Sequence, residues 1–180
     1  VKRAIEACRI EPRIIGMKAY WGRSTGDLTI IPEEDQHRVL ETLAREGYEG
    51  VLVSHCEKEV VMRDDLYDSQ NPITWSTLSR PEKAEINSFE DIIRMAEEVR
   101  FEGTIHVAHV STIEVVDTIN NYNSFPLRMS FPLKFSCGVT PHHLFLDNSR
   151  LSSEDGAWYK CNPPLRDRIT QEGLLERFLE

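Results

Sequence analysis

The sequence predicts an α/β fold built on a parallel sheet, and three observations lead to this prediction. Short apolar runs alternate along the chain with segments whose apolar residues recur at helical spacing. One run, residues 50–55, is almost wholly apolar, which is typical of a strand covered on both faces. The runs are separated by enough residues for a helical crossover, which parallel pairing requires.

The expected elements follow from periodicity and from their end signals. Pro32 suits the start of the first expected helix, and Gly47 suits its end. Ser88 and Ser111 are each followed three residues later by an acidic residue, close to the capping box that opens helices. The expected strands cover residues 13–19, 50–55, 104–110 and 134–139, and the expected helices begin near residues 33, 88, 111 and 170.

These elements amount to about four βα units over residues 1–180. A complete (β/α)8 barrel takes about 250 residues, whereas this chain has 180. We therefore expect one domain that is the central portion of a TIM barrel, or a degenerate relative of one. Residues 56–87 are polar and contain Pro72 and Pro81, so we expect an excursion above the barrel there.

Composition excludes several classes of function. The formal net charge is −9 and no dense Lys/Arg cluster occurs, which argues against nucleic acid or an anionic membrane as partners. No run approaches the ~20 apolar residues of a membrane span, and the first residues lack a signal-peptide pattern. The four cysteines form no C-x-x-C pair. We expect them to be reduced, in a cytoplasmic protein.

Three residues that can bind metal stand at the ends of apolar runs: Lys18, His55 and His109. In a parallel barrel the carboxyl ends of all strands open on one face, so the three side chains are expected to converge there. Imidazole is the commonest side-chain metal ligand. Burial would lower the pKa of Lys18 and leave a neutral amine that can be modified; the alternative is a lysine whose ammonium reaches solvent.

Strand alternation also predicts which way neighbouring side chains face. It places His109 on the same face as Ile105 and Val107, and it turns His106 toward the helices as a structural residue.

Two further segments carry polar groups suited to binding. His142 and His143 are adjacent, so at most one of them is expected to face the site. Pro163 and Pro164 hold Asn162 in an extended loop that can present its amide to a ligand. The alternative for this loop is a rigid turn into the last helix.

The order of these segments resembles the central part of a dihydroorotase of the cyclic amidohydrolase superfamily. The ordered series covers almost the whole chain, and it is far more specific than any single motif. The matching segments are Gly16-Met17-Lys18-Ala19-Tyr20, Ser24-Thr25-Gly26-Asp27-Leu28, Ser54-His55-Cys56-Glu57, Ser79-Arg80-Pro81, Ala84-Glu85, His106-Val107-Ala108-His109-Val110-Ser111-Thr112, Thr140-Pro141-His142-His143-Leu144-Phe145-Leu146 and Asn162-Pro163-Pro164-Leu165-Arg166.

The resemblance implies a zinc-dependent TIM-barrel hydrolase that interconverts N-carbamoyl-L-aspartate and L-dihydroorotate in pyrimidine synthesis. It implies that Lys18 is carboxylated by carbon dioxide and bridges two zinc ions, with one or two Zn²⁺ per full-length subunit. It implies that His55 and His109 bind the more buried metal and that Asn162 lies near the substrate. The loop after Lys18, which includes Thr25, is implied to border the substrate.

Parts of the family pattern are missing from this sequence. It contains neither the His-x-His pair of the second metal nor the Asp-His-Ala-Pro segment, whose aspartate is the general base. Gly138 stands where the family usually has glutamate. No catalytic acid–base residue is therefore assigned, and the chain alone is expected to be inactive.

Three alternatives to a dihydroorotase remain open. The chain could come from an allantoinase, from a dihydropyrimidinase, or from a non-catalytic homologue that serves as a structural partner of aspartate transcarbamoylase. The adjacent His142 and His143 favour dihydroorotase, because allantoinases usually have His-Tyr there. A homo-oligomer is the family expectation.

Overall fold

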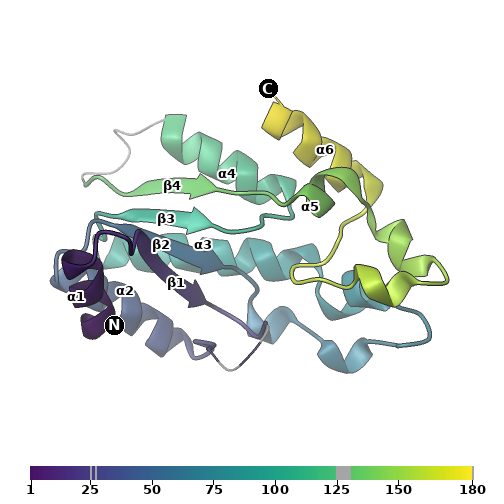
Figure 1. The fold of residues 1–180 in the computed structure, drawn as a ribbon, viewed down its shortest axis with the longest axis horizontal. Coiled ribbons are helices and arrows are strands. Elements are labelled where there is room, and N and C mark those ends of the chain that lie inside the picture. Colours follow the sequence, from purple (N-terminus) through teal and green to yellow (C-terminus); the bar gives the residue numbers. More distant parts are fainter. Residues whose placement is uncertain (25, 27, 125–130, 180) are drawn as a thin grey trace.

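The structure is a computed structural model that describes residues 1–24, 26, 28–124 and 131–179. Its centre is a sheet of four parallel strands in chain order, drawn as arrows in Figure 1. The strands are β1 (Gly16–Tyr20), β2 (Val51–His55), β3 (Thr104–Val107) and β4 (Lys134–Cys137). The predicted α/β class and the parallel pairing are confirmed.

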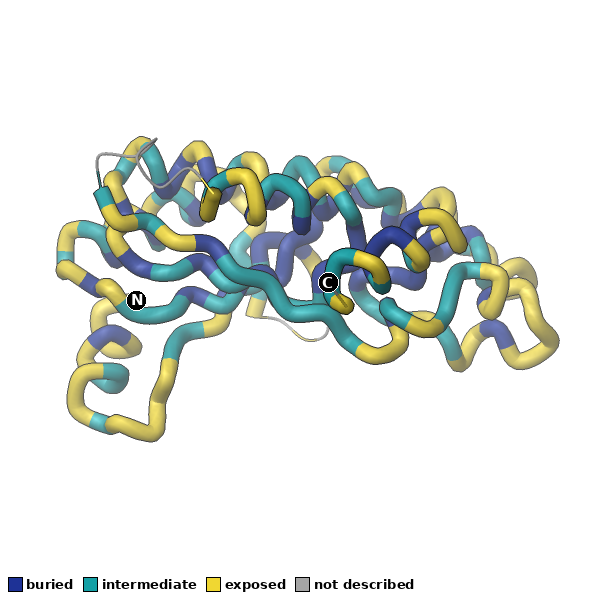
Figure 2. Tube along the Cα trace, turned by 90° about the horizontal axis from the view of Figure 1, so that it is seen from above, coloured by how far each residue is buried: buried dark blue, intermediate teal, exposed yellow. Residues whose placement is uncertain are grey.

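Six α-helices are described, and three of them follow a strand as crossovers. Figure 2 shows the helical layer along one side of the strands. Buried residues of α2, α3 and α4 pack there against Ala19, Leu52 and Ile105, which forms the core. The helices are α1 (Lys2–Ile10), α2 (Glu33–Arg45), α3 (Glu82–Glu98), α4 (Ile113–Ser124), α5 (Pro141–Phe145) and α6 (Arg168–Leu179).

The opposite face of the sheet is not covered by this helical layer. One row of register-paired residues crosses it, and every member is half-buried or exposed. Parallel-barrel strands are normally buried on both faces. This row therefore corresponds to the inner face of a barrel; it consists of Lys18, Val53, His106 and Ser136.

Helix α2 agrees with the sequence prediction. Pro32 is its N-cap, and its first turn is acidic, which suits the positive end of the helix dipole. Gly47 follows its last turn with φ +61°, a conformation that residues with a Cβ rarely adopt.

Helix α3 begins earlier than predicted. It starts at Glu82, directly after Pro81, so Ser88 lies buried inside the helix and does not open it. Proline directly before a helix is compatible with its first turn, because the first amides of a helix have no intrahelical partner. The polar excursion consequently ends near residue 81, not near residue 87.

The capping box predicted at Ser111 and Glu114 is wrong. The backbone N–H groups of Ser111 and Thr112 donate instead to the Glu85 carboxylate of α3, at 2.9 and 3.2 Å. Both hydroxyls also donate to Glu85. A buried carboxylate from a neighbouring helix therefore stabilises the start of α4, which no local pattern reveals.

Two segments fold together beyond the carboxyl ends of the strands, on the right of Figure 1. One follows β2 and contains the short helices η1 (Glu59–Val61), η2 (Asp64–Leu66) and η3 (Trp75–Ser79); the other follows α5 and contains η5 (Asn148–Ser152) and η6 (Gly156–Tyr159). Trp75 Nε1 donates to the Cys161 carbonyl at 2.9 Å, and Ser76 Oγ donates to the Leu165 carbonyl at 2.6 Å. The predicted excursion thus packs on the loop that contains Asn162.

Other features were not predicted or are not described. Helices α1 and α5 were not expected from the sequence. Thr25 and Asp27 belong to the loop after Lys18 that is predicted to border the substrate, and they lie outside the described residues. Within the described ranges, no helix combines the length and the apolar character that crossing a bilayer requires.

Candidate metal centre

Two of the predicted ligands lie side by side. His55 is the last residue of β2, and His109 lies in the turn after β3. His55 Nδ1 is 3.3 Å from His109 Nε2, and the ring planes meet at 71°. His55 is fully buried, whereas His109 is half-buried. The structure thus brings together two imidazoles that are 54 residues apart in the chain.

His109 reaches this position because the strand has already ended. Its φ is +45°, in the left-handed region that non-glycine residues rarely occupy. The turn is fixed on both sides, because Ala108 N donates to the Ser54 carbonyl at 3.0 Å and Val110 N donates to the Gly138 carbonyl at 2.9 Å.

The predicted facing of the residues around β3 is therefore wrong. Ile105 and Val107 are buried toward the helices, while His106 shares the uncovered face with Lys18. His106 Nδ1 lies 2.9 Å from Ser136 Oγ of β4. A Cβ added to Gly138 would come within 3.2 Å of His106 Nε2, so a larger residue there would crowd this ring. Strand alternation cannot be carried past Val107 to His109.

Lys18 lies on the same side of the sheet, and its charge acts on His109, but within the described residues no hydrogen bond joins it to either imidazole. Its Nζ is 5.1 Å from the centre of the Tyr20 ring, and that ring is 5.6 Å from the His55 ring. Partial desolvation lowers the pKa of Lys18, as carboxylation of its amine would require. Its role as a ligand stays a prediction.

The facing imidazoles suit a divalent metal ion. Two nitrogens that each lie about 2.0–2.1 Å from a tetrahedral zinc ion are about 3.3 Å apart, which is the separation of His55 Nδ1 and His109 Nε2. Burial, followed by the charges of His55, Lys18 and His143, lowers the pKa of His109 to about 3. His109 is therefore neutral at physiological pH, which is the form that binds metal. The donor set fits the group that the fold implies.

The other side of His55 contacts a buried ion pair. Its Nε2 is 3.0 Å from Glu57 Oε2, and the same oxygen accepts a hydrogen bond from Arg80 Nη1 at 2.6 Å. His55 and Glu57 are 0 % exposed and Arg80 is 2 % exposed. In the sequence, Glu57 and Arg80 stand out only as members of the matching motifs. The signal that could have found them is an acidic residue two positions after a strand-end histidine.

The pair belongs to a larger buried network. Arg166 donates from Nη1 to the Arg80 carbonyl at 2.6 Å and from Nε to Ser111 Oγ at 3.0 Å. Ser111 in turn holds Glu85. Arg166 therefore connects the loop of Asn162 to the segments that follow β2 and β3, the two strands at whose ends the histidines lie.

A second group of possible ligands lies at α5. Ligand atoms of His142, His143 and Cys161 are within 4.8 Å of one another. Both ring nitrogens of His143 are already engaged, by Thr140 Oγ1 at 2.6 Å and by the Pro163 carbonyl at 3.1 Å. These bonds hold α5 to the Asn162-Pro163 segment, so the group has a structural role. Asn162 itself is half-buried, and its contact with a substrate stays a prediction.

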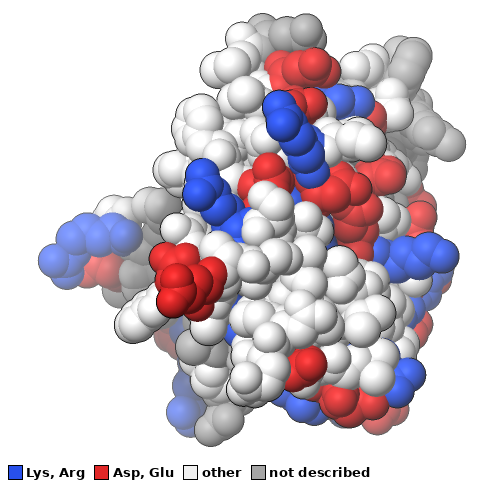
Figure 3. Space-filling model, turned by 90° about the vertical axis from the view of Figure 1, so that its right-hand side faces the viewer, with Lys and Arg blue, Asp and Glu red and all other residues white. Residues whose placement is uncertain are grey.

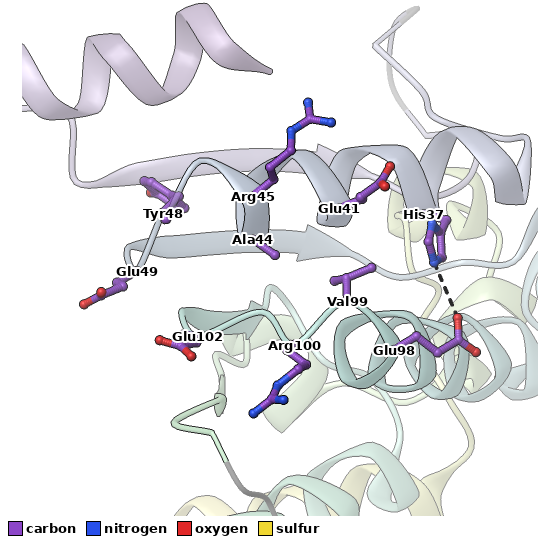
Figure 4. A pocket seen from close by; sticks show the side chains of 11 residues that line it. His37, Glu41, Ala44, Arg45, Tyr48, Glu49, Glu98, Val99, Arg100 and Glu102 are labelled. Carbon is purple, nitrogen blue, oxygen red and sulfur yellow. Dashed lines mark ion pairs between the residues drawn. The ribbon is translucent and has the colours of Figure 1, made fainter.

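Charged side chains are arranged differently at the two ends of the sheet. Figure 3 looks toward the end to which the strands point and shows a largely uncharged area with charged side chains around it. At the opposite end, a cavity of about 640 Å³ lies between α2 and the end of α3. In Figure 4 its charged side chains, including Arg45 and Arg100, point in different directions, and its one drawn ion pair joins His37 to Glu98. It therefore lacks convergent groups for chemistry.

Comparison with known proteins agrees with the fold and with the order of the motifs. The chain is 31% identical over 115 residues to the dihydroorotase of Methanothermobacter thermautotrophicus, which is 62% of this chain and 24% of that protein. It is 31% identical over 158 residues to the dihydroorotase of Halobacterium salinarum, which is 87% of this chain and 33% of that protein. The chain thus spans about a quarter to a third of these relatives. No family model matches it.

Among solved structures, the D-hydantoinase of Bacillus sp. AR9 superposes with a TM-score of 0.72 at 22% identity, over 97% of this chain and 37% of that one. The sheet, the helices and this match define the fold as a part of a TIM barrel. Within that class, the chain is a distant homologue of the dihydroorotases over part of their length.

Proposed function

We propose that this chain is the central part of a dihydroorotase, which forms and opens L-dihydroorotate with the help of zinc. The observation that carries the proposal is the 3.3 Å approach of His55 Nδ1 and His109 Nε2 at the carboxyl ends of neighbouring strands. The relationship to dihydroorotases supports the choice of substrate. The four free cysteines support a reducing, cytoplasmic location.

In this proposal, His55 and His109 hold the metal ion through neutral nitrogens, and Lys18 joins them as a carbamate. A bound metal ion would lower the pKa of a water molecule and polarise the ring amide. Asn162 would bind the substrate from the loop that Arg166 fixes against Arg80 and Ser111. The chain itself supplies no general base in this assignment.

A chimera tests the function. The matching segment of the Halobacterium salinarum dihydroorotase would be replaced by this chain, and the purified chimera would be assayed with dihydroorotate, dihydrouracil, hydantoin and allantoin. We expect opening of dihydroorotate and loss of activity in a matched chimera with His55→Ala. A folded, zinc-loaded chimera that opens dihydrouracil, hydantoin or allantoin but not dihydroorotate would contradict the proposed substrate.

The isolated chain provides a second test. With added zinc and bicarbonate it should bind metal but show no turnover of dihydroorotate, because the His-x-His and Asp-His-Ala-Pro segments are not part of it. Robust turnover would refute the expectation of inactivity.

A hydantoinase or dihydropyrimidinase is the second candidate, because the superposed structure is a hydantoinase. That match is below 25% identity and therefore supports the fold alone. The sequence relationship to dihydroorotases favours the first candidate.

A further inference from the structure

We propose that Glu57, held by Arg80, is a positioning residue that fixes the proton of His55 on Nε2 and thereby directs the lone pair of Nδ1 toward His109. The metal-affinity part of this inference rests on the proposed function. The part that concerns the proton of His55 rests on the geometry of the chain alone.

The contact geometry is the first step. Glu57 Oε2 lies between two groups, 3.0 Å from His55 Nε2 and 2.6 Å from Arg80 Nη1. The contact with His55 is close but lies outside hydrogen-bond geometry, so His55 Nε2 has no hydrogen-bond partner among the described residues. An ionised carboxylate oxygen carries only lone pairs and repels an unprotonated ring nitrogen at this distance, so the contact favours a proton on Nε2 of His55. A ring protonated there presents an unprotonated Nδ1 on its other side, which is the atom that faces His109.

Burial makes the arrangement depend on Arg80. A fully buried carboxylate is stable only when a cation or several donors compensate its charge. Arg80 also donates to the Arg23 carbonyl at 2.8 Å and lies 4.6 Å from the centre of the Trp75 ring. Its guanidinium is therefore fixed independently of Glu57, and it holds the carboxylate in place beside His55.

The position of the proton on His109 then follows from that on His55. With His55 Nδ1 unprotonated, the 3.3 Å contact in the metal-free chain needs its proton on His109 Nε2. His109 Nδ1 is buried and has no hydrogen-bond partner among the described residues. It is free to receive the proton when a cation binds between the rings. Binding would thus change the tautomer of His109 and leave that of His55 unchanged.

Within the described residues, the side chain of Glu57 makes a hydrogen bond only with Arg80. Its second oxygen, Oε1, is buried without a hydrogen-bond partner within the described part of the chain. The backbone of Arg80 is held separately by Arg166. Removal of the carboxylate together with the charge of Arg80 should therefore affect His55 more than the fold.

The first experiment measures ring tautomers in the 180-residue chain by long-range ¹H–¹⁵N correlation, before and after zinc is added. His55→Gln and His109→Gln assign the signals. We expect a proton on Nε2 of His55 in both states, and a proton on His109 that moves from Nε2 to Nδ1. A proton on Nδ1 of His55 in the metal-free chain would overturn the proposal without any Glu57 variant.

The second experiment compares E57Q, the double variant E57M/R80M and the control E85Q. The double variant removes both charges, so it leaves no unpaired buried ion. Glu85 is a matched buried carboxylate that contacts neither imidazole in the described structure. We expect E57Q and E57M/R80M to lose the fixed tautomer of His55 and to bind zinc 10- to 100-fold more weakly. E85Q should lower stability but keep the tautomer.

The outcomes separate this inference from the proposed function. A folded E57M/R80M that keeps the Nε2 proton of His55 and binds zinc within twofold of the parent chain would overturn the positioning role. If neither Glu57 variant folds, the tautomer in the parent chain decides. If the parent chain shows the expected tautomer but binds no zinc, the proposed function fails while the orienting role of Glu57 stands.

Discussion

The left-handed backbone at His109 is the most informative single-residue feature of this chain. A non-glycine residue in such a conformation costs about 1–3 kcal/mol and persists only where its surroundings enforce it. Here the backbone hydrogen bonds of Ala108 and Val110 enforce it, and the result is an imidazole placed against His55.

This strain can be measured by substitution at His109. Asn tolerates the left-handed region, whereas a β-branched residue does not. We predict that His109→Val has a free energy of unfolding at least about 1 kcal/mol below that of His109→Asn, in urea titrations with a chelator present. Equal stabilities would show that φ +45° is not enforced in solution.

His143 gives a prediction about pH. Burial, more than the nearby charges, lowers its pKa to about 4. The folded state then binds fewer protons than the unfolded state between pH 6.5 and pH 4, so stability is lost as pH falls through this window. His109 contributes in the same direction.

We predict that the free energy of unfolding falls by up to about 1.4 kcal/mol per pH unit for each such histidine. His143→Gln should reduce the difference in the free energy of unfolding between pH 7 and pH 5 by the contribution of one histidine. Urea unfolding at both pH values measures this difference. The exposed neighbour His142 provides the control. His142→Gln should keep most of the slope of the unfolding free energy against pH. An unchanged slope in His143→Gln would contradict the buried, neutral state of this ring.

At the level of elements, the start of α4 depends on a side chain from α3. Glu85 accepts hydrogen bonds from the backbone of Ser111 and Thr112. We predict that Glu85→Gln lowers the free energy of unfolding by about 1–3 kcal/mol and speeds hydrogen exchange at both amides. Glu114→Gln, at the position that the capping-box pattern favoured, should change stability by less than about 0.5 kcal/mol. The reverse ranking would contradict this account of α4.

The helices differ in how well local sequence signals predict where they begin and end. Helix α2 could be predicted because Pro32, the acidic first turn and Gly47 are adjacent to the bonds they influence. The starts of α3 and α4 could not, because Ser88 is buried by packing and the partner of Ser111 is 26 residues away. Likewise, the strand ends indicated His55 and His109, while the contact of Glu57 with Arg80 depends on how the excursion folds back.

At the level of the molecule, half of the sheet surface is uncovered. Lys18, Val53, His106 and Ser136 lie on that face, and in the described structure the outer edges of β1 and β4 pair with no strand. Open sheet edges promote association. We predict that the 180-residue chain associates as its concentration rises, and that Val53→Lys reduces this. Light scattering coupled to size-exclusion chromatography would measure it, and a monomer at about 100 μM would contradict the open face.

The central claim is that His55 and His109 share one metal ion. A crystal of this chain with zinc, measured on both sides of the zinc absorption edge, tests it most directly. The account predicts an anomalous peak about 2.0–2.1 Å from both His55 Nδ1 and His109 Nε2. A zinc-loaded crystal whose anomalous peaks all lie elsewhere, with the two rings still in direct contact, would contradict it.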